Sequence, residues 1–290
     1  MKTVYRVLVV LCAMLLTPAC SSPPRNRGEI FDTRSRAETQ LELGNRQADR
    51  GDPGAALFLL DEAMRLAVLA DDSGLRVRVG LSRSNVFFSM GRSEEAEAGW
   101  NAALDEALLS GNRELVALSR VHLARGRLLS PGGGAVAQSL IDEITPETAF
   151  LRDRLSLAFA WTVVGLAEGE LGRFDRAEAA VRRSLETHER NGYIELAAFD
   201  WFMIASFRSR SGNTGGARQA LEASMALDRR VENSWGLASS WRALGDVERR
   251  AGNPEAARAA YLRAADIFRA LGNSQLAEDT MLRIALTTDH

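Results

Sequence analysis

The stretch that decides the fold runs from Trp241 to Ala264 and reads WRALGDVERRAGNPEAARAAYLRA. It places two segments rich in helix-forming Ala, Leu, Arg and Glu on either side of a Gly252-Asn253-Pro254 break. An asparagine before a proline is a favoured helix start, because the side chain caps the first amides and proline needs no partner for an N–H. The stretch therefore predicts two helices joined by a tight turn.

Small and large side chains follow a fixed order within this stretch. A small residue at Gly245 or Ala257 lets the two helices approach closely, and the large Tyr261 fills the seam that they leave. The pattern resembles the tetratricopeptide repeat, which implies an all-α, right-handed superhelical solenoid that binds partners. The residues that carry the resemblance are Trp241, Leu244, Gly245, Gly252, Ala257, Tyr261 and Ala264.

Glycines at the expected turn recur along the chain at intervals of about 40 residues, with one double interval in the middle. Pro131 lies near the turn that the double interval lacks. We therefore expect six helix–turn–helix units, followed by a capping helix over residues 274–286 that shields the last apolar edge. The turn glycines are Gly51, Gly91, Gly172, Gly212 and Gly252.

The expected helix boundaries carry further signals. Asp52-Pro53 repeats the Asn253-Pro254 pattern and predicts the start of a second helix. Ser93 and Thr145-Pro146 are interpreted as helix starts in the same way, and glycine or asparagine is expected to end each unit. The expected stops are Gly74, Gly111-Asn112, Asn191-Gly192 and Gly272-Asn273.

The third unit departs from this pattern. Residues 130–134, Ser-Pro-Gly-Gly-Gly, would break its first helix and leave only a short second helix over residues 135–144. A shortened helix would change the stacking angle of the units. The solenoid is therefore predicted to form two arms, residues 35–144 and 145–290.

The first twenty residues differ from the rest. Lys2 and Arg6 precede an apolar run over residues 7–16 that is shorter than the roughly 20 residues needed to span a bilayer. Residues 1–19 are therefore interpreted as an export signal. The run ends in Leu16-Thr17-Pro18-Ala19-Cys20, which resembles a bacterial lipoprotein cleavage site apart from its proline, and the resemblance implies a lipid on Cys20. Ordinary signal-peptide cleavage near Ala19 is the alternative.

The two cysteines fit the lipoprotein interpretation. Cys12 lies in the removable run and Cys20 would carry the lipid, so the mature chain would have neither a free thiol nor a disulfide. Residues 20–34 would form a polar, proline-containing tether and residues 35–290 the solenoid. Ser21 resembles the residue that follows the lipidated cysteine in outer-membrane lipoproteins. We therefore expect a membrane anchor in the cell envelope, at the outer membrane facing the periplasm.

The composition gives no support for catalysis or for a general nucleic-acid surface. The net charge of -2 lacks the basic excess expected of a nucleic-acid-binding domain. The only histidines are His122, His188 and His290, and none belongs to a metal-binding or nucleophile motif. His122 is interpreted as a packing residue, and His188 falls in an Arg- and Glu-rich helix end. We expect no enzyme activity, no metal and no cofactor.

The resemblance implies that the first helices of successive units line a concave groove. Asn45, Asn85 and Arg125 recur every 40 residues at a first-helix position that would face it. Two amides and a guanidinium would hold the backbone of an extended peptide and then its carboxylate. Plain solvation of an inner face is the alternative.

The same face of the later units carries aromatic and charged residues that would suit a partner helix or a peptide with apolar anchors. Its phenylalanines would be core residues instead if the helix phase is shifted by one position. The residues are Phe159, Phe199, Phe202, Arg242, Asp246 and Arg249.

These features predict an exported, lipid-anchored scaffold that binds a peptide or helix of another protein. Its plan resembles the small tetratricopeptide lipoproteins of pilus secretion and outer-membrane assembly. A small-ligand carrier or receptor associated with a transporter, and a self-associating structural scaffold, are the alternatives. A molecule bound to the purified protein would favour the carrier, and oligomers that depend on concentration would favour self-association.

Overall fold

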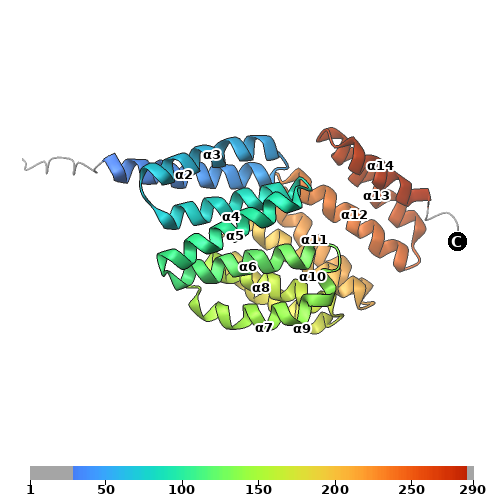
Figure 1. Ribbon diagram of the computed structural model, residues 1–290. Coiled ribbons are helices and arrows are strands. Elements are labelled where there is room, and N and C mark those ends of the chain that lie inside the picture. Colours follow the sequence, from blue (N-terminus) through green and yellow to red (C-terminus); the bar gives the residue numbers. More distant parts are fainter. Residues whose placement is uncertain (1–28, 286–290) are drawn as a thin grey trace, which may run out of the picture.

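The computed structural model describes residues 29–285, so the predicted signal, Cys20 and most of the predicted tether lie outside the described residues. The described part contains thirteen α-helices, two short 3-10 helices and no strand (Figure 1). No helix within it is both long and apolar enough to cross a membrane. Six consecutive helix pairs and a final single helix confirm the predicted all-α solenoid.

The units follow one another in chain order. The first three are α2 (Glu29–Asp49) with α3 (Pro53–Leu69), α4 (Ser73–Ser89) with α5 (Ser93–Ser110), and α6 (Arg113–Leu129) with α7 (Ala137–Glu147). The last three are α8 (Arg154–Glu170) with α9 (Phe174–Arg190), α10 (Ile194–Arg210) with α11 (Thr214–Arg230), and α12 (Ser234–Arg250) with α13 (Pro254–Ala270). The capping helix is α14 (Ser274–Ala285), and the 3-10 helices Gly133–Val136 and Thr148–Phe150 flank α7.

The turns within the units depend on glycine, as predicted. The five turn glycines have φ angles between 72° and 87°, in the left-handed region that side chains with a Cβ avoid. Gly132, with φ 82°, takes this place in the third unit, one residue after Pro131. The Asp52 side chain accepts a 2.9 Å hydrogen bond from the Ala55 amide, which confirms the predicted cap before Pro53.

Several predicted boundaries are wrong. Thr145-Pro146 lies in the last turn of α7 and starts no helix; Asp153 caps α8 instead, accepting from the Ser156 amide at 2.8 Å. Gly74 lies in the first turn of α4, because Asp71 takes the left-handed turn conformation with φ 48°. Ser93 is the first residue of α5, but no side chain caps that helix.

Two further boundaries need adjustment. Helix α2 begins at Glu29, so residues 29–34 of the predicted tether are helical. Asn253 precedes α13 as predicted, but its amide donates to Glu248 at 2.8 Å and does not cap the helix.

The core continues through the third unit. One buried cluster runs from α6 through α7 to α8 and α9, so the short α7 does not interrupt the core. The division into two arms stays a prediction.

Close packing between helices explains the recurring order of small and large residues along the repeats, within a unit at Gly245 and between two units at Gly126. A Cβ placed on Gly245 would lie 2.4 Å from the Tyr261 ring, and one placed on Gly126 would lie 2.2 Å from the Trp100 ring. Both distances are shorter than any real contact. Glycine is therefore required where an aromatic ring of a second helix packs against the first helix of its own unit or of the next unit.

The first helices form the inner wall of the solenoid. Neighbouring first helices contact each other directly at α2–α4, α4–α6, α6–α8 and α10–α12, whereas second helices make no comparable contact with one another. Elements that crowd together line the inside of a curve. Residues of the first helices that point away from their own second helix therefore face the concave side.

The curvature brings the first unit back to the last. A Cβ placed on Gly51, in the turn between α2 and α3, would lie 3.6 Å from the Trp235 ring at the start of α12. Figure 1 shows this end of α2 and α3 beside α12. Asp49 lies just before this turn, and loss of surrounding water together with repulsion from Glu195 in α10 of the fifth unit raises the pKa of Asp49 to about 6.

Candidate functional site

The inner wall of the second to fourth units carries a connected polar and aromatic cluster. The Asn85 carboxamide oxygen lies 3.2 Å from Trp100 Nε1, which donates to it, and 3.3 Å from His122 Nδ1. The His122 ring lies against the Phe159 ring, with 4.6 Å between centroids. Asn85, His122 and Phe159 come from α4, α6 and α8, so the cluster spans three consecutive first helices.

Arg125 lies one helical turn after His122 on the same wall. Its guanidinium is half-buried, and no carboxylate of the described residues forms an ion pair with it. Loss of surrounding water lowers the pKa of Arg125, and no neighbouring acid counters the shift. The group therefore remains a cation that lacks both full hydration and an internal counter-ion.

His122 contributes no charge to this cluster at neutral pH. Burial against the wall and the nearby Arg125 lower the pKa of His122 to about 3. The neutral ring contacts Asn85 on one side and Phe159 on the other. We call Asn85, His122, Arg125 and Phe159 the Arg125 cluster. It combines one cation, a carboxamide and a flat apolar surface.

Only some of the predicted site residues of the first half lie close together. Asn85, Arg125 and Phe159 gather in the Arg125 cluster, whereas Asn45 is exposed on α2 and belongs to no described contact of the cluster. His122 was interpreted as a packing residue and is the link that connects them. Its position three residues before Arg125 is a sequence signal for this role, because residues three apart share a helix face.

Two of the predicted site residues of the second half, Asp246 and Arg242, contact neighbouring helices. Asp246 accepts hydrogen bonds from the Tyr261 hydroxyl at 2.8 Å and from Arg283 Nη1 at 2.8 Å, so it joins α12 to α13 and α14. The Arg242 guanidinium lies over the Phe268 ring, 5.5 Å from its centroid, and burial lowers the pKa of Arg242. Arg249 is exposed in the last turn of α12.

The phenylalanines divide between surface and core. Phe199 is 49% exposed and stacks on Phe202, with 6.5 Å between ring centroids. Phe202 and Phe159 are partly buried and pack against the core clusters of their units. Phe199 is thus the phenylalanine of the three that offers the largest accessible surface to a ligand.

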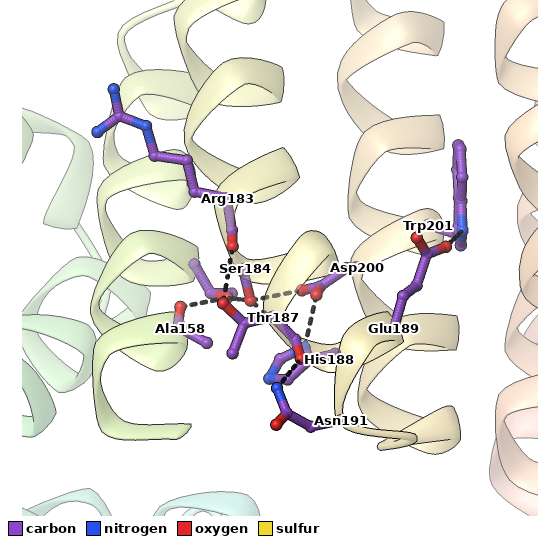
Figure 2. A network of polar contacts seen from close by, with 10 residues as sticks. Ala158, Arg183, Ser184, Thr187, His188, Glu189, Asn191, Asp200 and Trp201 are labelled. Carbon is purple, nitrogen blue, oxygen red and sulfur yellow. Dashed lines mark hydrogen bonds and ion pairs between the residues drawn. The ribbon is translucent and has the colours of Figure 1, made fainter. Parts of the chain in front are cut away.

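A buried polar network joins α8, α9 and α10 (Figure 2). His188 Nδ1 lies 2.6 Å from Asp200, Ser184 donates to Asp200 at 3.2 Å, and Thr162 donates to Ser184 at 3.0 Å. The side chains are almost completely buried, which places His188 in the interior although it falls in a charged helix end.

Serine, histidine and aspartate in one network do not make a nucleophile here. Ser184 and Asp200 both contact the same nitrogen, Nδ1, of His188, whereas a catalytic serine would need the opposite nitrogen. Burial also keeps a substrate away from Ser184. The network therefore fixes the fourth unit against the fifth. Among the described residues, no group of three or more His, Cys, Asp or Glu side chains could hold a metal ion.

Comparisons with known proteins agree with this architecture. The model of the tetratricopeptide repeat family matches residues 196–280. No curated protein matches the chain in sequence. Solved structures match it over most of its length at low identity, which makes the likeness one of fold.

Three of these structures illustrate the similarity of fold. A Rap protein complexed with competence and sporulation factor has a TM-score of 0.60 at 14% identity, over 87% of this chain and 74% of the Rap chain. Aspartyl phosphate phosphatase F from Bacillus subtilis has a TM-score of 0.52 at 11% identity, over 90% and 72%. PilW, a type IV pilus biogenesis factor, has a TM-score of 0.50 at 15% identity, over 84% and 98%.

The repeat pattern, the stacked helix pairs and these matches lead to one assignment. The fold is that of protein–protein interaction scaffolds. Residues 196–280 match the tetratricopeptide repeat family, and the described chain as a whole folds as a solenoid of stacked helix pairs that resembles the tetratricopeptide-repeat fold.

Proposed function

We propose that the chain is an envelope-anchored scaffold that binds an extended segment of another protein along its inner wall, with the Arg125 cluster receiving a carboxylate of that segment. The observation that carries the proposal is the half-buried guanidinium of Arg125, which has no counter-ion among the described residues. A buried cation without a partner is costly to maintain. A ligand carboxylate would supply the missing counter-charge.

The surroundings of Arg125 favour a carboxylate on an extended peptide over an isolated anion. A guanidinium binds a carboxylate through two parallel hydrogen bonds. The carboxamide oxygen of Asn85 is occupied by Trp100 and His122, which leaves its NH2 group as the one that would donate to a peptide carbonyl. Phe159 adds an apolar surface for a neighbouring side chain.

The related structures support a binding role in general terms. A solenoid of this fold has been solved in a complex with competence and sporulation factor, and another belongs to a pilus biogenesis factor. By analogy, we propose a partner in secretion, pilus or outer-membrane assembly. The analogy rests on fold, because the identities are 14% and 15%.

The membrane anchor in this proposal rests on the sequence that ends at Cys20. Growth of the host with labelled palmitate should label the chain, and the substitution Cys20→Ser should abolish the label and release the chain from the membrane fraction. Label that persists in Cys20→Ser would contradict lipidation at this residue.

The binding site is tested by photo-crosslinking in the host. A photoreactive amino acid replaces Leu118, a partly buried residue two helical turns before Arg125 on α6. In a second strain it replaces Phe58, which is 75% exposed on α3. We expect a discrete crosslinked partner at position 118 that disappears when Arg125→Ala is added. An adduct at position 118 that is unchanged by Arg125→Ala would contradict the assignment of the carboxylate to Arg125.

A further inference from the structure

An apolar rim lies at one end of the first two units. Val68 and Leu69 end α3, and Leu108 and Leu109 occupy the corresponding places near the end of α5. Their exposed fractions are 55%, 62%, 52% and 89%. Four large aliphatic side chains exposed at neighbouring helix ends are unusual for a surface that faces only water.

The later units carry charge at the same places. The residues that correspond to Val68 and Leu69 are Glu189 and Arg190 in α9, Arg229 and Arg230 in α11, and Arg269 and Ala270 in α13. The repeat itself therefore does not require apolar side chains at these positions. The rim is a property of the two units nearest the start of the solenoid.

The rim lies at the end of the molecule where the described chain begins. Arg34, near the start of α2, forms an ion pair of 3.1 Å with Asp72, in the turn that follows Leu69. Figure 1 shows the start of α2 at the same end as the turns after α3 and α5. Eight residues lie between Cys20 and Glu29, so an extended chain would place these two residues at most about 30 Å apart.

Ion pairs engage three of the acidic groups beside the rim. Asp72 pairs with Arg34, and Arg76 pairs with both Asp71 and Glu106. An open depression of about 510 Å³ lies between α4 and the end of α5, with Arg76, Glu106 and Leu109 among its lining residues. The surroundings of the rim thus hold these paired charges and the carboxylate of Asp105. The four aliphatic side chains are the part of this surface that suits the interface of a bilayer.

We infer that the rim of Val68, Leu69, Leu108 and Leu109 rests on the surface of the membrane that holds Cys20. The inference rests on the anchor in the proposed function. A second, apolar contact near the anchor would fix the orientation of the solenoid, because a single tether leaves it free to rotate. Insertion of leucines at a lipid interface adds binding in proportion to the apolar area that leaves water.

The test supplies the tether chemically, so that it does not depend on lipidation in the host. The full chain with Cys12→Ser has Cys20 as its only thiol, and this thiol is coupled to a maleimide lipid in vesicles of phosphatidylethanolamine and phosphatidylglycerol. Hydroxyl-radical oxidation is then measured at Leu69 and Leu109 by mass spectrometry. Leu282 of α14, which is 68% exposed and far along the chain, is the matched control.

We expect oxidation of Leu69 and Leu109 to fall about threefold or more on coupling, as for side chains that enter a lipid interface, while Leu282 is unchanged. Equal oxidation of Leu69 and Leu109 with and without vesicles would overturn the inference. Protection of these leucines in the uncoupled chain that increases with protein concentration would also overturn it, because it would indicate that a second copy covers the rim. A Leu69→Ser, Leu109→Ser variant should lose the protection at Val68 and Leu108. Absence of lipid on Cys20 in the host would contradict the anchor of the proposed function. The protection of Leu69 and Leu109 on vesicles tests only the contact between the rim and the bilayer, so the two failures are distinguishable.

Discussion

Charged residues on the inner wall have different partners in the third unit and in the sixth. Arg125 in α6 has no carboxylate partner among the described residues, whereas Asp246, six residues before its turn glycine in α12, accepts from Tyr261 and Arg283. Both residues occupy the same position of the repeat. One repeat position can therefore leave a charge for a ligand in one unit and satisfy it within the fold in another.

The difference follows from what comes next in the chain. The capping helix α14 packs against α13 and supplies Arg283 to Asp246. The unit after Arg125 supplies Phe159 and the buried Thr162, neither of which is an acid. Of these two regions, the wall around Arg125 is thus the one where a ligand would supply a missing counter-charge.

The largest effect is expected at Arg125. Once the crosslinked partner segment is known, Arg125→Ala should weaken its binding by about 2 kcal/mol or more, because a desolvated carboxylate would lose its charged partner. Arg242→Ala should change the affinity far less. Titration calorimetry measures both, and a larger loss from Arg242→Ala would reverse the comparison.

The requirement for glycine where helices pack closely should be equal at Gly126 in the third unit and at Gly245 in the sixth. Gly126→Ala and Gly245→Ala each force a Cβ into an aromatic ring and should lower the free energy of unfolding by about 1–3 kcal/mol. Gly215→Ala in α11 is the matched control, since a Cβ there meets nothing within 4 Å. Chemical denaturation measures the three variants. A neutral result at either tight glycine would contradict the packing account.

Asp246 should matter for stability and not for binding. Asp246→Ala leaves the buried Tyr261 hydroxyl and the partly accessible Arg283 without their acceptor, which should lower the free energy of unfolding by about 1–2 kcal/mol. Denaturation and calorimetry on the same variant separate the two properties. Weakened partner binding with unchanged stability would place Asp246 in the site instead.

The smallest effect concerns the pH dependence of stability that Asp49, near the turn of the first unit, is expected to cause. A raised pKa means that the folded chain favours protonated Asp49, so this group's stabilisation is complete below its ordinary value of 3.8 and is lost as pH rises through about 6. The melting temperature should therefore rise when the pH is lowered from about 7 to about 5. Asp49→Asn should reduce that gain, and an identical pH profile in the variant would exclude Asp49 as its source.

The sequence predicts the units well because their signals are local. Gly51, Gly252 and Asp52 act within one turn, so their roles can be inferred without knowing where other units lie. Thr145-Pro146 misleads for the same reason: a polar residue before proline fits a helix start, yet here the chain ends α7 at this point.

Contacts between units are harder to predict. The meeting of His122 with Phe159, and of Asp246 with Arg283, depends on the offset of neighbouring first helices, which a period of about 40 residues does not specify. The approach of Gly51 to Trp235 depends on curvature accumulated over all six units. The Arg125 cluster could therefore be predicted only as the residues Asn85, Arg125 and Phe159, without the contacts that join them.

The most direct test of the central claim compares two chemical forms of one ligand. A random peptide library is presented to the immobilised chain with free carboxyl termini and, separately, with amidated termini and no acidic side chains. We predict selective enrichment of carboxylate-bearing peptides on the wild-type chain and loss of that selectivity in Arg125→Ala, with the selectivity retained in Arg242→Ala. Equal enrichment of amidated peptides on the wild-type chain, or selectivity that survives Arg125→Ala, would contradict the account.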